Sequence, residues 1–139
     1  MKLSTRVRYG TRALVDLATH YGEPPQLIKE IARRQAISQH YLEQIIIVLK
    51  SAGLVKSIRG AKGGIILAKP PSSIRLSDIM NALEGSTAPV ECVDDAAACN
   101  RSSFCVMRDV WVEMKGAIDG VLEKKTLQNM VDRQGHAAD

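Results

Sequence analysis

Aromatic residues are scarce in this chain of 139 residues, where they make up only 4% of the composition. Single-strand nucleic-acid binders stack successive bases on aromatic rings, so this scarcity argues against that class and leaves duplex binding open. Long apolar runs are missing too, because no stretch approaches the roughly 20 residues that span a bilayer and residues 1–10 lack the apolar core of a signal peptide. We therefore expect a soluble, cytoplasmic protein that has no membrane partner.

Recognisable catalytic motifs are lacking as well. The glycine-rich stretch over residues 59–64 precedes a predicted strand, whereas a phosphate-binding loop leads into a helix. No nucleophile and base stand at a spacing that the sequence can localise. The neighbouring carboxylates of Asp94 and Asp95 are typical of a solvated loop. The sequence therefore predicts a protein that is not an enzyme.

Cysteine is infrequent, with only Cys92, Cys99 and Cys105. An odd number in a chain that shows no secretory signal argues against a disulfide framework and favours thiols that are reduced, ligated or reactive. Six and then five residues separate them, which is not the close pairing of a zinc ribbon. Three thiolates can hold an iron–sulfur cluster if a fourth ligand comes from elsewhere. Spacing alone, however, favours cysteines that share no function.

The composition includes enough apolar residues, 45%, for a buried core, and the net charge is +4. This charge is divided unevenly along the chain. Residues 1–75 carry thirteen Lys and Arg against four Asp and Glu, a balance of +9, whereas residues 76–139 carry six against eleven, a balance of −5. The first half is therefore suited to a polyanion such as nucleic acid, although a positive surface is often only solvated.

Apolar periodicity predicts helices over residues 5–20 and 27–35, and a third helix that Ser38 caps. Alternation then predicts strands over residues 54–58 and 65–68 around a turn at 59–64. Three helices and a two-stranded wing make a winged helix-turn-helix in a mostly α chain. Ser77 is expected to cap a short helix that Gly85 ends. The predicted core positions are Val7, Leu14, Leu17, Ala18, Leu27, Ile28, Ile31, Ala32, Leu42, Ile45, Ile46, Leu49, Ile79, Met80 and Leu83.

The remaining chain divides into an aperiodic stretch and a long helix. Residues 86–105 lack periodicity, and a helix over residues 106–124 follows, before a last short helix that Thr126 caps. The long helix carries an apolar stripe that exceeds what a small domain covers, so we expect a homodimer through it. The predicted parts are a DNA-binding domain (1–85), a cysteine-bearing loop (86–105) and a dimerisation region (106–134). The stripe consists of Val106, Val110, Met114, Ala117, Val121 and Leu122.

A polar face at the start of the third helix is the candidate DNA-reading surface, because such helices present a short polar face to base edges. Gln and Ser side chains bond to several bases, and a Glu accepts from the cytosine amino group. The alternative is the solvated face of an ordinary amphipathic helix. Arg59 and Lys62 on the predicted hairpin tip favour DNA binding, since long basic side chains reach a minor groove or phosphates. The candidate reading residues are Ser38, Gln39, His40, Glu43 and Gln44.

Four stretches together resemble the bacterial winged-helix family of iron–sulfur cluster regulators, which also includes nitric-oxide-sensing, iron-responsive and cysteine-metabolism repressors. The resemblance covers about residues 1–132 and implies a homodimer on a pseudo-palindromic operator. It also implies that Glu43 sets operator choice and that Arg59 enters the minor groove. Ile65 departs from the family, which usually has an aromatic residue there, and we expect this to affect packing rather than reading. The stretches are residues 37–38, 41–44, 53–55 and 57–64.

The same resemblance implies that Cys92, Cys99 and Cys105 bind an iron–sulfur cluster, with a two-iron cluster favoured over a four-iron one. The fourth ligand stays open, because Arg108 and Arg8 stand where family members have a histidine or an aspartate ligand. The other reading is a cluster-free repressor of cysteine or sulfur metabolism, controlled by a partner enzyme or by thiol oxidation. Remaining candidates for the fourth ligand are Asp109, Glu91, Asp94, Asp95, His40 of the partner subunit and an exogenous molecule.

Overall fold

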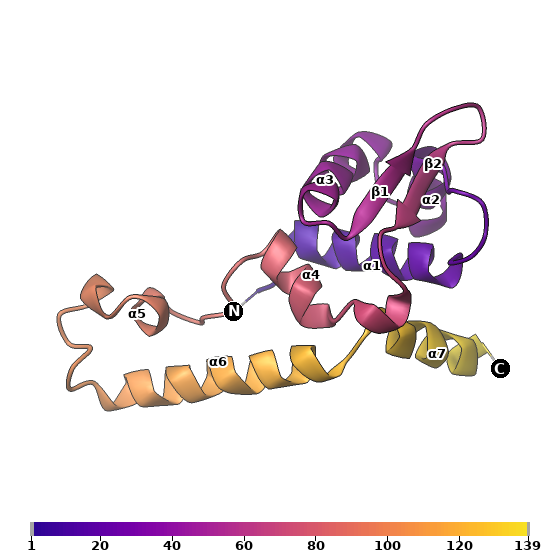
Figure 1. Cartoon of the computed structure of the whole chain (residues 1–139). Helices are drawn as coiled ribbons and strands as arrows, with labels where there is room; N and C mark the ends of the chain where they lie inside the picture. The colour runs from indigo at the N-terminus through magenta and orange to yellow at the C-terminus, as the bar shows by residue number, and fades with distance from the viewer. Residues whose placement is uncertain (1, 139) are drawn as a thin grey trace.

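The computed structural model describes residues 2–138, which fold into a helical head and a projecting helix (Figure 1). Three helices open the chain, α1 (Thr5–Thr19), α2 (Ile28–Gln35) and α3 (Gln39–Ser51), and the antiparallel strands β1 (Val55–Ile58) and β2 (Gly64–Leu67) follow. This is the winged helix-turn-helix that the sequence predicts. We call residues 2–85 the head.

The core of the head lies where α1, α3 and α4 (Leu76–Leu83) meet. Ser4 begins α1, since its side-chain oxygen accepts a hydrogen bond from the Val7 backbone N–H at 3.2 Å. A side chain at Gly10 would collide with Leu83, so glycine allows α1 and α4 to approach closely. All the predicted core positions are buried except Leu27, which is 45% exposed, and Ile28, which is half-buried. Leu27 precedes the first turn of α2 and therefore does not share its inward face.

The wing is attached to the head through the chain that leads into α2. Its strands pair from Val55 opposite Leu67 to Ile58 opposite Gly64. Gln26 adds an isolated bridge to Ile65, whose backbone N–H donates to the Gln26 carbonyl oxygen at 2.7 Å. Ile65 is itself buried in the core, so its side chain packs the wing against the head.

The end of the chain returns to the head. α7 (Leu127–Ala138) packs against α1 and the 3-10 turn at Pro71–Ser73, and Leu127 is fully buried. The Leu76 backbone N–H donates to the Lys125 carbonyl oxygen at 2.9 Å, which fixes the start of α4. The expectation that Ser77 caps α4 is therefore wrong: Arg75 is the cap residue, and its backbone N–H is satisfied by the Asp78 carboxylate at 2.9 Å.

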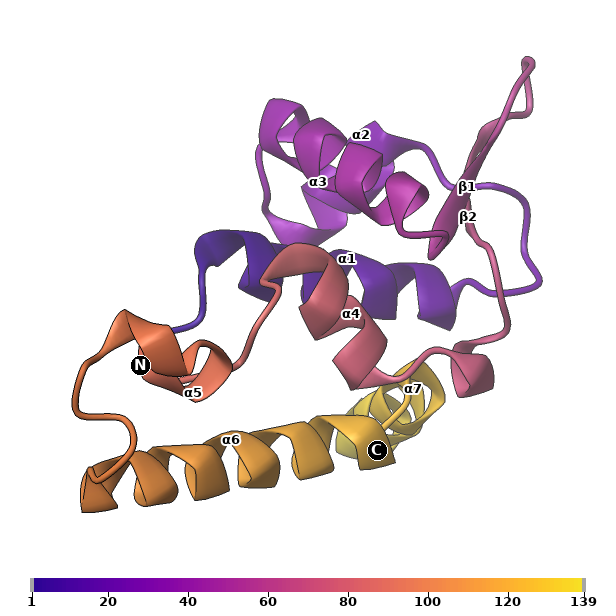
Figure 2. The same cartoon turned by 60° about the vertical axis from the view of Figure 1, so that its left-hand side comes forward.

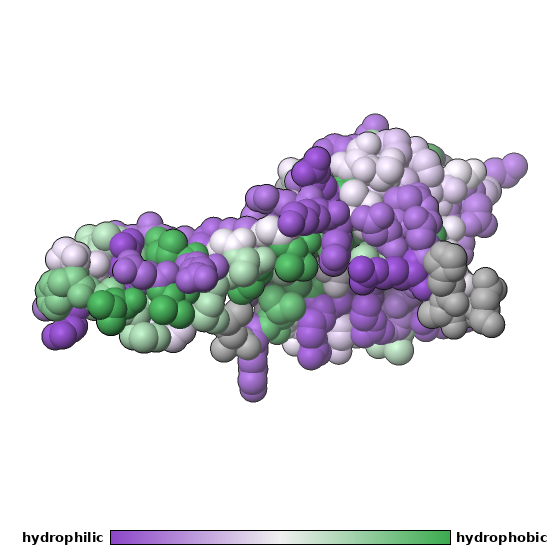
Figure 3. Space-filling view, turned by 90° about the horizontal axis from the view of Figure 1, so that it is seen from below, coloured by the Kyte–Doolittle hydropathy of each residue, from purple (hydrophilic) through white to green (hydrophobic). Residues whose placement is uncertain are grey.

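Between these parts the chain forms α5 (Glu91–Asp94), a 3-10 turn at Ala96–Ala98 and the long helix α6 (Val106–Lys124). Short helical turns within residues 86–105 are too brief to show periodicity, so the sequence predicted only an irregular stretch. α6 projects beyond the head in both views (Figures 1 and 2). Apolar residues gather along this projecting part (Figure 3). Within residues 2–138, none of the helices combines the length and apolar character that crossing a membrane requires.

Candidate nucleic-acid interface and cysteine segment

The start of α3 presents the polar side chains that the sequence singled out. Ser38 caps the helix, because its hydroxyl accepts from the Tyr41 backbone N–H at 3.0 Å. The remaining four candidates are exposed and pair one turn apart. The Gln39 amide donates to the Glu43 carboxylate at 3.2 Å, and the amide nitrogen of Gln44 lies 3.2 Å from the imidazole of His40. The structure therefore gathers all five residues at one end and on the outer face of α3.

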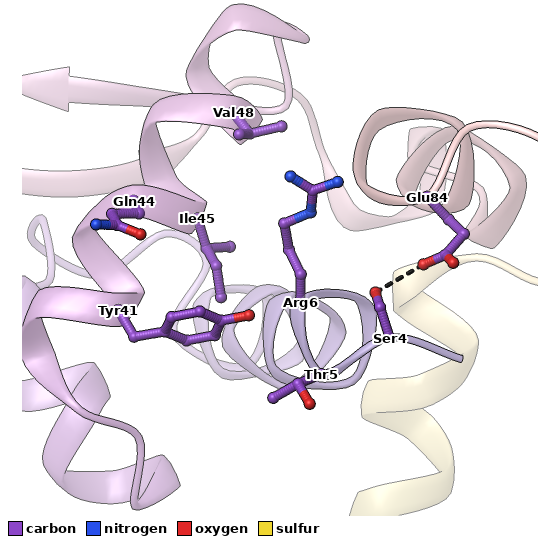
Figure 4. Close-up of a pocket in the computed structure, with 8 residues that line it drawn as sticks. All are labelled: Ser4, Thr5, Arg6, Tyr41, Gln44, Ile45, Val48 and Glu84. Atoms are coloured by element: carbon purple, nitrogen blue, oxygen red, sulfur yellow. Dashed lines mark hydrogen bonds between the residues drawn. The ribbon is translucent and has the colours of Figure 1, made fainter. Parts of the chain in front are cut away.

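A hollow of about 460 Å³, lined by both polar and apolar side chains, lies between α3 and the beginning of α1 (Figure 4). Tyr41 and Gln44 line it from α3, and Arg6 points into it from α1. Arg6 is anchored, since its Nε donates to the Leu83 carbonyl oxygen at 3.0 Å. Sequence reasoning missed Arg6 as a member of this surface, because only the fold brings the start of α1 beside the reading helix.

On the other side of α3, a hollow of about 370 Å³ lies between the helix and the wing. Gln39 and Glu43 line it together with Ser57 and Ile58 of β1. Glu43 therefore faces the side of α3 from which the wing extends.

The wing tip carries Arg59 and Lys62, both exposed. The turn depends on glycine: Gly60 has φ +108°, and a side chain at Gly63 would collide with the Ile58 carbonyl oxygen. The tight turn leaves the two basic side chains at the end of a narrow ribbon, which is the shape that a groove of DNA admits.

A buried carboxylate behind this surface joins α1 to α2 and to the root of the wing. Asp16, 5% exposed, accepts hydrogen bonds from Arg34 at 2.6 and 2.9 Å and from Gln35 at 3.0 Å. Arg34 also donates to the Gln26 side chain at 3.0 Å. Burial by itself raises the pKa of Asp16, but the hydrogen bonds from Arg34 and Gln35 and the charges of Arg34 and His20 outweigh it and lower the pKa.

The three cysteines lie at the far end of the molecule, on residues 86–105, which we call the cysteine segment. All three thiols are free; Cys92 and Cys105 are half-buried and Cys99 is exposed. Arg108 holds the segment against α6, because its Nε donates to the Cys92 carbonyl oxygen at 2.9 Å. Nowhere in the described chain do three or more His, Cys, Asp or Glu side chains gather as a metal site would require. As arranged, the cysteines therefore do not fit a preformed cluster site.

A family model described as "Rrf2: Iron-dependent Transcriptional regulator" matches residues 3–133. The chain belongs to the Rrf2 family. This confirms the resemblance drawn from the reading helix and the wing. The match covers the head, the cysteine segment and α6 together.

Three similar proteins illustrate the range of Rrf2 regulators. The HTH-type transcriptional regulator CymR of Bacillus subtilis is 41% identical over 94% of the chain and 89% of that protein. The structure of this CymR, the global cysteine regulator of B. subtilis, has a TM-score of 0.81 at 39% identity, over 96% of this chain and 98% of that one. Protein rrf2 of Nitratidesulfovibrio vulgaris is 45% identical over 94% of the chain and 87% of that protein. The structure of T. potens IscR has a TM-score of 0.82 at 44% identity, over 99% of this chain and 90% of that one.

The relatives named CymR and IscR are HTH-type transcriptional regulators, and the chain is a transcriptional regulator of the same Rrf2 family rather than an enzyme. The structural neighbours also confirm the winged-helix fold. The similar proteins include both CymR and IscR regulators.

Proposed function

We propose that this Rrf2 regulator represses transcription by binding an operator duplex as a homodimer, with α3 in the major groove and the wing at the neighbouring minor groove. The observation that carries the proposal is the exposed polar start of α3 beside a basic wing, in the half of the chain whose charge balance is +9. A recognition helix that buries one face and presents polar residues at its N-terminal end is how helix-turn-helix proteins read DNA.

The contacts divide by chemistry. Glu43 accepts a hydrogen bond from a base but repels phosphates, so it selects sequence more than it adds affinity. Arg59 at the wing tip is attracted to the negative potential of a narrow minor groove. Arg6, beside the other edge of α3, is placed to meet a phosphate, which would position the helix without reading sequence.

Dimerisation through α6 completes the site, since two heads are needed for a pseudo-palindromic operator. None of residues 106–124 is buried in the single chain. Val106 is 77% exposed, Val110 is 42% exposed and Val121 is 54% exposed, all on one stripe of the helix. Pairing two such stripes removes this apolar surface from water.

The test is selection of binding sites from random duplex, followed by titration of the selected site against salt. If a dimer neutralises about 6–10 phosphates, affinity falls by about 10³–10⁵-fold between roughly 50 and 200 mM salt. Glu43→Ala should return a changed motif, whereas the matched control Lys50→Ala, in the last turn of α3, should return the wild-type motif. Failure of the wild-type protein to enrich any sequence would rule out the proposed function.

We also propose that the cysteine segment is the sensing element and that Cys92, Cys99 and Cys105 hold one iron–sulfur cluster per subunit, two-iron in preference to four-iron. Three thiolate donors within one segment suit such a cluster, and the matching family is described as iron-dependent. The described arrangement does not gather the thiols, so binding would require the segment to rearrange. If the cluster stabilises one arrangement of the cysteine segment over the other, and the two arrangements differ in operator affinity, cluster binding would change that affinity.

The test is anaerobic purification with measurement of iron, sulfide and visible absorption. Wild-type protein should show the visible absorption of a bound cluster, and each of the three Cys→Ala variants should lack it. The operator affinity of the variants should change in parallel. Ser103→Ala, a nearby exposed position, is the matched control and should keep both. Retention of the absorption in all three cysteine variants would show that the ligands are elsewhere.

A second candidate is a cluster-free repressor whose thiols are oxidised directly or whose cysteine segment meets a partner protein. Three observations favour it: the described residues form no group of three or more metal-binding side chains, Cys99 is exposed, and the chain is similar to a regulator called CymR. Colourless anaerobic protein whose operator affinity responds to a mild thiol oxidant would support this candidate over the cluster.

A further inference from the structure

An apolar side chain continues the polar reading face by one helical turn along the outer side of α3. Ile47 exposes 63% of its surface, the largest exposed fraction of any large hydrophobic residue in the head. Single exposed apolar residues are common and need no explanation by themselves. The exposure of Ile47 is informative because of its position on α3, the predicted reading helix.

Ile47 lies along the outermost line of α3. The helix buries Leu42, Ile45, Ile46 and Leu49, and at about 100° per residue Ile47 points almost directly away from them. Glu43 lines the hollow toward the wing and Gln44 lines the hollow toward α1. Ile47 lines neither of these hollows, so it lies on the ridge between them.

Its neighbours differ from it in chemistry. Gln39 pairs with Glu43, and His40 with Gln44, so each polar residue on this face has a hydrogen-bond partner while the protein is free. Ile47 has no polar atom and can lose unfavourable exposure to water only against an apolar surface. In the major groove the apolar group on base edges is the 5-methyl group of thymine.

We infer that Ile47 is a specificity-determining residue that contacts a thymine methyl group of the operator. This inference rests on the proposed function. Ile47 stands one turn after Glu43, about 6 Å along the helix axis. The thymine is therefore expected within about two base-pair steps, at roughly 3.4 Å each, of the base that Glu43 reads. Ile47 and Glu43 then read neighbouring positions by different chemistry.

The experiment removes single methyl groups from the DNA. In the selected operator, each thymine is replaced in turn by deoxyuridine, which differs from it only by the methyl group, and affinity is measured for wild-type protein and variants. One position per half-site should lose about fourfold in affinity, the equilibrium factor for one buried methyl group. In Ile47→Ala that loss should disappear, and in Ile47→Val, which keeps a branched side chain, it should persist.

Leu3→Ala is the matched control, because Leu3 is also exposed, at 56%, but lies before α1 and lines hollows with α4 and the end of α6 instead of α3. It should preserve the ratio of thymine to deoxyuridine affinity. Equal affinities of wild-type protein for all the substituted operators, or an unchanged ratio in Ile47→Ala, would overturn the inference. Either result would leave the proposed function intact, whereas absence of any selected operator would remove the proposed function itself.

Discussion

The head and the α6 helix differ in what stabilises them. Apart from Leu127, every buried hydrophobic residue of the described chain lies between Val7 and Leu83, whereas residues 106–124 contain none. The head thus encloses its own core, and α6 leaves its apolar stripe in contact with water. A helix of this kind gains its stability from tertiary or quaternary packing more than from propensity. With Leu127 of α7, the head buries its apolar residues within a single chain, whereas α6 does not.

Charge is also divided unevenly along the chain. Residues 1–75 carry the positive balance and residues 76–139 the negative one. The positive stretch contains α3 and the wing and is suited to DNA. α6 carries three basic residues against four acidic ones, and its exposed apolar stripe is suited to a second copy of the chain.

The largest expected effect comes from charging the α6 stripe. Ala117→Asp with Val121→Asp should convert the dimer to a monomer and lower operator affinity by more than about a hundredfold, since each head then binds alone. Light scattering at micromolar concentration measures the assembly state. Gly116→Asp is the control: it adds one such charge at an exposed position off the stripe, where nothing lies within 4 Å of an added Cβ atom. A double variant that remains dimeric would contradict pairing through α6.

Asp16→Asn tests whether the head depends on its buried ion pair. Removing the carboxylate leaves Arg34 without its partner, so the free energy of unfolding at pH 7 should fall by about 2–3 kcal/mol. Because the folded-state pKa of Asp16 is lowered, this stabilisation is complete above the unfolded pKa of about 3.9 and is lost as the pH falls through the lower folded-state pKa.

Urea unfolding at pH 7 and pH 3 measures both parts of this prediction, and the difference between wild type and Asp16→Asn should shrink at pH 3. Glu30→Gln removes a carboxylate from the exposed pair with Arg33, whose nitrogen lies 2.8 Å from it, and should leave unfolding unchanged. A difference that is the same at both pH values would mean that Asp16 does not stabilise the head through its charge.

Arg59→Ala should weaken operator binding about tenfold, with the greatest loss on sites whose minor groove is narrow, because an inserted arginine reads groove potential. Fluorescence anisotropy on operators with A·T-rich and G·C-rich flanks measures this preference. Lys69→Ala, exposed beyond β2 and away from the wing tip, removes one positive charge as a control and should change affinity by less than about threefold. Equal losses of operator affinity in Arg59→Ala and Lys69→Ala would indicate that only the positive charge matters and that the wing tip makes no specific contact with the minor groove.

The smallest effect is expected at the cysteine segment. Arg108→Met removes the hydrogen bond to the Cys92 carbonyl oxygen, and amide hydrogen exchange over residues 90–95 should accelerate by about fivefold, the factor for one hydrogen bond. Exchange in the head should stay unchanged. The control Arg101→Met removes an exposed guanidinium that lies 5.1 Å from the centre of the Phe104 ring. Acceleration of the same size in both variants would show that Arg108 does not hold the segment.

Local patterns predicted much of the head. The 3.6-residue period of α1 and α3 and the alternation before and after the glycine-rich turn were sufficient, because each element there buries one regular face. The predictions for Ser77 and Leu27 were wrong. The start of α4 depends on Lys125, which is distant in sequence, and Leu27 precedes the first turn of α2 and so does not share its buried face. The five α3 candidates could be placed on one surface for the same reason, since one helix carries all of them.

The winged-helix order, the uneven charge and the exposed stripe of α6 could be predicted from the amino-acid sequence alone, because they follow from periodicity, composition and helix length. The positions of Arg6 beside α3 and of Asp16 between α1 and the root of the wing could be seen only in the folded chain. These features depend on contacts between segments that are far apart in the sequence, which local patterns do not encode. The cysteine segment has no periodic apolar face from which its contacts could be predicted.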